Sequence, residues 1–132
     1  MIKDENCVFC KIIANELPSY KVYEDENLFG FLTIRPHKKG HMLLIPKNHS
    51  EDIVEMDSED YEKLFAVAKD IAGKIKEIFS APRVSLVTMG LAVAHTHLHI
   101  LPISEESDLN LDMAYDISKE EATEVQGLYK FS

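Results

Sequence analysis

Three of the six histidines in this 132-residue chain stand at alternate positions, His95, His97 and His99. Side chains alternate between the two faces of a strand, so an extended segment would place all three imidazoles on one face, roughly 6.6 Å apart along the chain. A helix would separate successive rings by about 200°. The apolar residues that follow, up to Pro102, favour the strand. Such a row of imidazoles could hold one small charged group.

Both cysteines fall in one short motif, Cys7-Val8-Phe9-Cys10. A thioredoxin-like redox pair normally follows a strand and opens a long helix, and only six residues precede this motif. Two cysteines and two histidines are a common ligand set for structural zinc. We therefore assign one zinc per chain to Cys7, Cys10, His49 and His95. One alternative is a free cysteine pair with a solvated His49. The other is that the three alternating histidines stand on a polar strand face by coincidence.

Three histidines then remain for chemistry: His41, His97 and His99. His41 follows Gly40, where the backbone can approach a ligand closely. A neutral imidazole can attack phosphorus and form a covalent intermediate, provided that an acceptor holds its other nitrogen and selects the right tautomer. A neighbouring imidazole can donate to phosphoryl oxygens or protonate the leaving group. We interpret His37, in a loop beside two lysines, as solvent-exposed.

Charge and composition limit the classes of partner. The chain carries 23 acids and 14 bases, a net charge of −9, and its 45% apolar and 28% charged residues are typical of a soluble globular domain. The acidic balance argues against nucleic acid and anionic membrane surfaces, but not against a small phosphate-bearing ligand in a local pocket. No apolar run approaches the roughly 20 residues of a membrane span. The first six residues lack a signal peptide's apolar core, so we expect a cytoplasmic protein.

The elements that must position these residues follow from periodicity. Asn6 is expected to cap a short N-terminal helix, and Asp57 or Ser58 caps one long helix that runs to about Phe79, with apolar residues at steps of three and four. A fifth strand carries the triad, and four others are predicted at 19–24, 28–34, 41–46 and 83–89. The acidic segment 104–132 is weakly periodic, with a short helix at 119–126. The sequence predicts a single α+β domain over residues 1–132, a five-stranded antiparallel sheet with one long helix and a short N-terminal helix.

These residues resemble the histidine triad (HIT) family in its nucleotide-binding branch, whose signature is His-x-His-x-His followed by apolar residues. The similarity includes the segments 7–18, 22–26 and 39–49 in the family's order, and it covers residues 7–103 in all. The resemblance implies a HIT-like fold and a homodimer in which two five-stranded sheets join into one. It also implies the same zinc site, as in zinc-bearing relatives.

The resemblance further implies an activity. Relatives hydrolyse or transfer nucleotidyl groups at the α-phosphate of purine nucleotide derivatives, typically phosphoramidates, through a covalent nucleotidyl-histidine. By this analogy His97 is the nucleophile, His99 contacts the phosphate and His41 supports the site. The expected nucleotide-binding residues are Phe9, Ile12, Phe31, Thr33, Ile34, His97 and His99.

Two features depart from the family pattern. Thr33 stands where an acidic residue usually binds the ribose hydroxyls, and a hydroxyl cannot supply the charge-assisted pair of a carboxylate. The loop before the triad is apolar, with Leu91 and Ala92 where a Gln-Ser pair usually lies near the phosphate. A catalytically weak nucleotide-binding or regulatory dimer is therefore the alternative function. A protein that binds only metal, with all its histidines and both cysteines, is a third.

Overall fold

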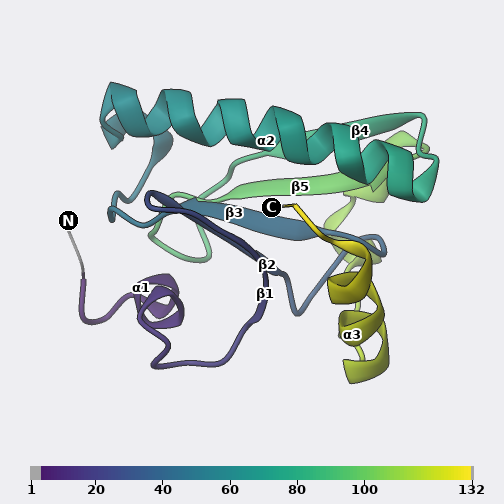
Figure 1. The fold of residues 1–132 in the computed structure, drawn as a ribbon, viewed down its shortest axis with the longest axis horizontal. Coiled ribbons are helices and arrows are strands. Elements are labelled where there is room, and N and C mark those ends of the chain that lie inside the picture. Colours follow the sequence, from purple (N-terminus) through teal and green to yellow (C-terminus); the bar gives the residue numbers. More distant parts are fainter. Residues whose placement is uncertain (1–3, 132) are drawn as a thin grey trace.

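Five strands form one antiparallel sheet in the order β1-β2-β3-β5-β4 in the computed structural model, which describes residues 4–131 (Figure 1). Residues 1–3 and 132 of the predicted domain lie outside the described residues. The strands are β1 Tyr20–Glu24, β2 Leu28–Leu32, β3 Met42–Pro46, β4 Arg83–Val87 and β5 Leu98–Ile103. The helices are α1 Val8–Ile13, α2 Ser58–Phe79 and α3 Lys119–Leu128, with 3₁₀ turns η1 Ile53–Glu55, η2 Glu106–Leu109 and η3 Leu111–Met113. The predicted fold class is confirmed.

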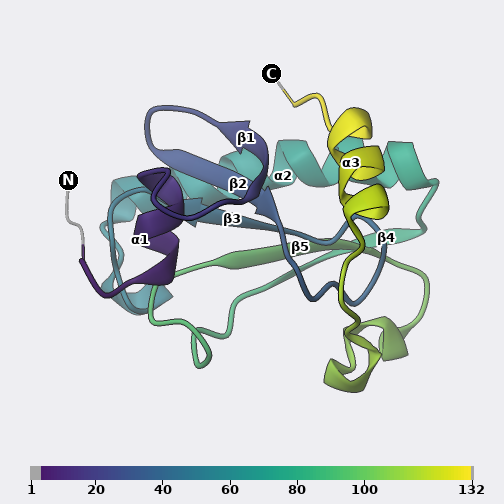
Figure 2. The same cartoon turned by 90° about the horizontal axis from the view of Figure 1, so that it is seen from below.

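The long helix α2 lies along one face of the sheet (Figures 1 and 2). The Asp57 carboxylate accepts the Glu59 N–H and caps the first turn, as the sequence predicts. The residues of α2 that it buries recur at steps of four and three, namely Leu64, Ala68, Ile71 and Ile75. In each strand, alternate residues point to the face of the sheet that α2 covers. The apolar side chains on this face pack against the buried stripe of α2, so the main core lies between α2 and the sheet.

The opposite face of the sheet packs against α1 (Figures 1 and 2). Its second cluster contains the intervening strand residues Phe29, Phe31, Leu43 and Ile45. Leu43 lies directly opposite His99 in the β3–β5 pairing, and opposed residues share a face. His99 therefore belongs to the α1 side of the sheet. His41 immediately precedes β3 and lies diagonally across from it.

The prediction that the triad occupies one strand is wrong in part, because β5 begins only at Leu98. His95 and His97 lie in the irregular segment before it. There the Thr96 N–H donates to the Ser50 carbonyl at 2.7 Å, and the Thr96 hydroxyl lies 2.8 Å from that of Ser50. These bonds to Ser50, in the loop that follows β3, take the place of the hydrogen bonds that a longer β5 would make within the sheet. Only His99 is held by strand geometry.

The acidic C-terminal segment contributes to the main core. The predicted short helix is confirmed as α3, which lies beside β1. Four residues of the segment are buried in the main core, namely Ala122, Val125, Tyr129 and Phe131. Across residues 4–131, the structure contains no helix long and apolar enough to cross a membrane.

Candidate functional site

Four side chains predicted as metal ligands meet at the α1 end of the sheet. Cys7, Cys10, His49 and His95 each direct one donor atom into a cluster whose atoms all lie within 4.8 Å of one another. The His95 Nδ1 lies 3.3 Å from Cys7 Sγ, 3.5 Å from Cys10 Sγ and 3.1 Å from His49 Nδ1. His95 is fully buried, and both cysteines are buried free thiols.

The donor set fits a tetrahedral zinc ion. Zn–S and Zn–N bonds of ordinary length place sulfur and nitrogen ligands about 3.6 Å apart and two nitrogens about 3.3 Å apart. The distances from His95 match this spacing closely. The His95 Nε2 lies 2.8 Å from the Pro46 carbonyl, which can only accept, so Nε2 carries the proton and Nδ1 offers its lone pair to a metal. Burial raises the pKa of the Cys7 thiol, because it disfavours the charged thiolate. A bound cation would offset this unfavourable free energy.

The helix that carries the cysteines begins one residue later than expected. Cys7, and not Asn6, is the N-cap, because its Sγ accepts the Cys10 N–H at 3.2 Å. Between the two cysteines, Phe9 turns its ring towards the histidines, with centroids 5.1 Å from His97 and 6.0 Å from His95 in edge-on geometry. The segment that carries the two cysteines thus also lies against His97 through Phe9.

His97 is held in one tautomer by the backbone. Its Nδ1 lies 2.7 Å from the carbonyl oxygen of His95, so Nδ1 must donate and Nε2 keeps a free lone pair. The His97 side chain is buried, and its ring lies 5.1 Å from that of His99. A buried imidazole whose lone pair is fixed in this way is a suitable nucleophile.

His41 and His99 form a second, directed relay. The His37 N–H donates to His41 Nδ1 at 3.1 Å, which leaves the proton of His41 on Nε2. That Nε2–H donates to His99 Nδ1 at 2.9 Å, which in turn places the proton of His99 on its Nε2. The chain of contacts therefore ends in an N–H donor on His99, whose ring lies 5.1 Å from that of His97.

Burial keeps both relay rings neutral. Burial, followed by the nearby His99 and His37, lowers the pKa of His41 from 6.5 to about 3. Burial, followed by His97 and His37, lowers the pKa of His99 to about 4. At neutral pH the relay therefore works through neutral tautomers, and His99 acts as a hydrogen-bond donor without a full charge.

The interpretation of His37 as solvent-exposed is wrong. The residue is only partly exposed, its ring packs edge-on against His41 at 5.3 Å, and its Nδ1 is buried. The turn to Gly40 brings it back against the site. Sequence reasoning weighed only the flanking lysines and missed that the His37 backbone N–H could orient His41. The spacing of four residues between two histidines, with Pro36 and Gly40 bounding a tight loop, was the available signal.

The other predicted nucleotide-binding residues divide into two groups. Phe9, Ile12 and Phe31 are buried together on the α1 face, with the Phe9 and Phe31 rings 5.4 Å apart. Thr33 and Ile34 lie beyond the end of β2, where Ile34 is 68% exposed and the Thr33 hydroxyl accepts the Arg35 N–H. The structure thus gathers three of the predicted residues into one cluster, in which Phe9 contacts His97, and leaves Thr33 and Ile34 outside it.

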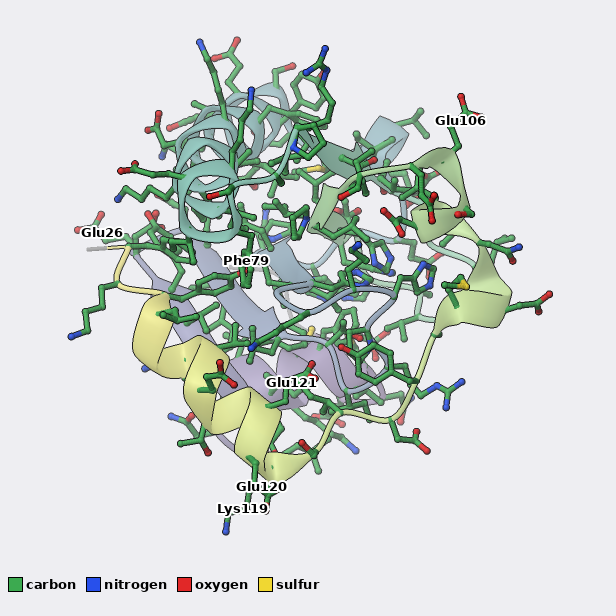
Figure 3. All side chains as sticks on the ribbon, turned by 90° about the vertical axis from the view of Figure 1, so that its right-hand side faces the viewer. Glu26, Phe79, Glu106, Lys119, Glu120 and Glu121 are labelled. Atoms are coloured by element: carbon green, nitrogen blue, oxygen red, sulfur yellow. The ribbon has the colours of Figure 1, made fainter. Side chains whose placement is uncertain are left out.

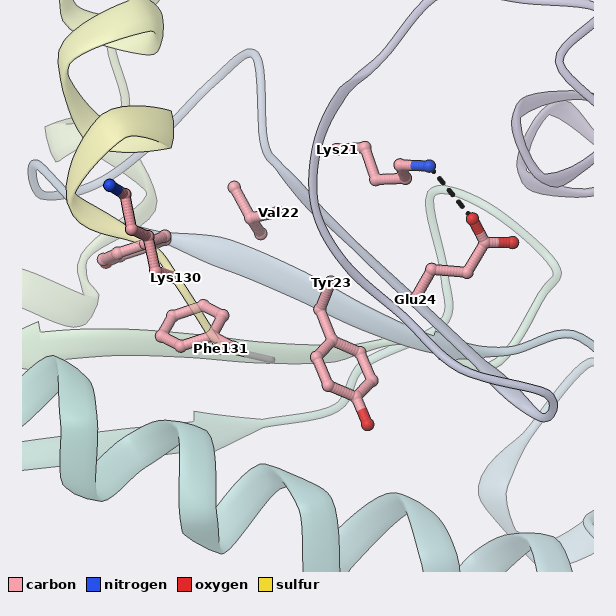
Figure 4. Close-up of a pocket in the computed structure, with 7 residues that line it drawn as sticks. Lys21, Val22, Tyr23, Glu24, Lys130 and Phe131 are labelled. Atoms are coloured by element: carbon pink, nitrogen blue, oxygen red, sulfur yellow. Dashed lines mark hydrogen bonds and ion pairs between the residues drawn. The ribbon is translucent and has the colours of Figure 1, made fainter.

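A hollow at the β1 edge of the sheet is separate from this group. It is lined by Lys21, Val22, Tyr23, Glu24, Tyr129, Lys130 and Phe131, and Lys21 and Glu24 form an ion pair beside it (Figure 4). None of its lining residues is a histidine or a cysteine.

Comparison with known proteins identifies the family. The HIT domain model matches residues 14–106, which include the three triad histidines, His41 and His49. The chain belongs to the HIT family. A HIT-like protein involved in cell-cycle regulation from Bartonella henselae has the same fold, with a TM-score of 0.84 at 30% identity over 98% of this chain and 97% of that one. The likeness in fold thus includes the C-terminal segment of this HIT protein.

Two further relatives bear on chemistry. The adenosine 5′-monophosphoramidase of Saccharomyces cerevisiae is 33% identical over 104 residues, which are 78% of this chain and 66% of the yeast protein. A Zn-bound histidine triad family protein from Mycobacterium smegmatis has a TM-score of 0.75 at 29% identity, over 94% of this chain and 93% of that one. This HIT protein therefore has one relative named as a phosphoramidase and one solved relative that holds zinc.

Proposed function

We propose that this HIT protein hydrolyses or transfers nucleotidyl groups at the α-phosphate of nucleoside phosphoramidates or related nucleotide derivatives. One observation carries the proposal: the His97 Nδ1–H is held by the His95 carbonyl, which leaves the Nε2 lone pair free, and the His97 ring lies 5.1 Å from that of His99, whose Nε2 carries a proton. The yeast relative named as a phosphoramidase supports the substrate class.

The proposed reaction has two steps. The His97 Nε2 attacks the α-phosphorus, the new N–P bond forms as the bond to the leaving amine breaks, and the amine leaves with a proton from solvent. The His99 Nε2–H donates to a phosphoryl oxygen and offsets its developing charge. Water or another acceptor then attacks phosphorus and releases a proton to solvent, and the N–P bond breaks to restore neutral His97.

We further propose that Cys7, Cys10, His49 and His95 hold one structural zinc, which would anchor α1 and the His95 carbonyl. The four clustered donors, of which Cys7, Cys10 and His95 are buried and His49 is partly buried, and the zinc-bound relative support this. Within residues 4–131 they are the one group of three or more such ligands brought together, so the proposal expects one zinc per chain. Several zinc ions per chain would instead favour a protein that binds only metal.

Assembly and location belong to the same proposal. Among residues 4–131, the strand β4 pairs only with β5 and so forms an edge of the sheet, where unpaired backbone groups can join a second copy. Leu86 on β4 and Met89 just after it are 37% and 50% exposed, which supports a homodimer through this edge. Thiolate ligands persist in a reducing compartment, which supports a cytoplasmic location.

Trapping of the intermediate tests the activity. The protein is mixed with adenosine phosphoramidate, quenched in base and analysed by mass spectrometry for an adenylyl adduct on His97. The matched control is His97→Asn, whose amide can still donate to the His95 carbonyl but has no nitrogen at the Nε2 position. An adduct in the wild type alone is expected. No adduct and no turnover with several nucleoside bases would refute the enzymatic proposal.

A second candidate is a nucleotide-binding or regulatory dimer without turnover. The observation that favours it is the loop before the triad, where Leu91 is 96% exposed and offers no polar group to a phosphate. Tight binding of AMP, together with no adduct after mixing with adenosine phosphoramidate, would select this function. Adduct formation would exclude it.

A further inference from the structure

The acidic C-terminal segment, which includes Glu106, Glu120 and Glu121 labelled in Figure 3, contacts the basic loop that leads to His41 through ion pairs. Each of the three cations between residues 35 and 39 pairs with an acid beyond residue 104, although the two regions are far apart in sequence. The pairs are Arg35–Asp116 at 2.9 Å, Lys38–Asp108 at 3.4 Å and Lys39–Glu124 at 2.6 Å. This one-to-one match of charges indicates that the segment does more than fill the core.

Backbone contacts follow the same path. The Tyr115 N–H donates to the Pro36 carbonyl and the Ile117 N–H to the Ile34 carbonyl, each at 3.0 Å. The C-terminal segment therefore runs alongside the loop and bonds to it at several points. A loop held in this way has few alternative conformations.

The Lys38–Asp108 pair differs from the other two in burial. The Asp108 side chain is only 4% exposed, whereas the acids of the other pairs are 87% and 57% exposed. Exposed pairs contribute little to stability. Asp108 also accepts the N–H groups of Ser104 and Glu105, which directly follow β5. It thus ties Lys38 to the end of the strand that carries His99.

Lys38 lies within the turn that orients His41. The His41 N–H donates to the Lys38 carbonyl at 3.1 Å, and the neighbouring His37 N–H donates to His41 Nδ1 at 3.1 Å. If this turn shifts, His41 Nδ1 loses the donor that fixes its tautomer. The His41 proton could then sit on either nitrogen, and His99 would present a lone pair in place of an N–H for part of the time.

We propose that Asp108 is a positioning residue: through Lys38 it holds the His37 N–H on His41 and so keeps the Nε2–H of His99 directed at the substrate. The catalytic consequence rests on the proposed function, whereas the tautomer of His41 does not. On this inference, the acidic segment 104–131 acts as a clamp, because it restrains the basic loop that leads to His41.

The test compares Lys38→Met, which removes the cation but leaves the Asp108 bonds to the backbone, with Lys38→Arg, which restores it. Lys69→Met, on an exposed position of α2, is the matched control. Nitrogen-15 NMR of the imidazoles in the zinc-loaded protein reports each tautomer without turnover. We expect mixed tautomers for His41 and His99 in Lys38→Met only, with His95 unchanged.

Kinetics add a second readout. In Lys38→Met, kcat with adenosine phosphoramidate should fall about tenfold because a donor to the phosphoryl oxygen is present only part of the time, while KM changes little. Lys38→Arg should recover most of this loss. If Lys38→Met does not fold, Asp108→Asn takes its place, since the amide oxygen can still accept the two backbone N–H groups.

Unchanged tautomers of His41 and His99 in the folded variant would overturn the proposal, even if kcat or thermal stability falls. Altered tautomers in a protein that proves inactive towards every nucleotide would support the clamp and refute only the proposed function. The two failures are therefore distinguishable.

Discussion

His41 should make the folded protein less stable as the pH is lowered below neutrality. Burial, followed by His99 and His37, lowers its pKa in the folded state to about 3, whereas an unfolded chain titrates near 6.5. Between these values the unfolded chain binds a proton that the folded protein does not. The stabilising contribution is thus complete above pH 6.5 and is lost as the pH falls towards 3.

Linkage between these two pKa values sets the size of the effect. Between pH 7 and pH 5, His41 alone should remove about 2 kcal/mol from the free energy of unfolding. That is a large share of the roughly 5–15 kcal/mol that stabilises a typical domain. The effect arises because the His41 ring is almost fully buried, with only 3% of the residue exposed.

The matched variant is His41→Gln. Its amide can still donate to His99 Nδ1 but does not titrate. Urea unfolding of both zinc-loaded proteins at pH 7 and pH 5 gives four free energies, and the wild type should lose about 2 kcal/mol more than the variant. Any release of zinc at pH 5 affects both proteins and cancels in the difference. Equal losses would show that His41 is protonated in the folded protein and refute the neutral relay.

Three further outcomes are expected. Chelation of zinc should speed hydrogen exchange across α1, because its two cysteines lose their anchor; unchanged exchange there would argue against the metal site. Gly40→Ala should lower the free energy of unfolding by about 3 kcal/mol in urea titrations. Gly40 has a φ of +98°, and a Cβ there would lie 2.5 Å from the Phe79 ring and 2.6 Å from the Tyr129 hydroxyl. Wild-type stability in this variant would contradict the observed packing. Thr33→Asp should tighten AMP binding about tenfold by calorimetry, because a carboxylate accepts charge-assisted bonds from ribose hydroxyls. An equal gain for a nucleotide that lacks both hydroxyls would place Thr33 away from the ribose.

Local patterns in the sequence were enough for most of the fold. The apolar steps of three and four between Asp57 and Phe79 predict α2 to within a residue, because a helix buries one stripe whatever it packs against. Four strands appear within two residues of their predicted bounds, since alternation and flanking turn residues are local features. The grouping of Cys7, Cys10, His49 and His95 could also be predicted from residue type, because cysteine and histidine are the usual ligands of structural zinc.

Other features depended on contacts between distant segments. The three triad histidines follow one alternating pattern, yet Ser50 and the cysteines draw His95 out of the sheet, and only His99 stays in β5. The tautomers of His97 and His41 are set by backbone groups, and a backbone N–H or carbonyl has no signature in the sequence.

Residue types and spacing by themselves determined which elements form, which side chains can ligate a metal and which can attack phosphorus. Only the tertiary structure decided which nitrogen of each imidazole carries a proton, and that the acidic segment beyond residue 104 binds the basic loop before His41. The physical reason is range: helix and strand periodicity act over a few residues, whereas hydrogen bonds and ion pairs depend on where folding brings remote groups together.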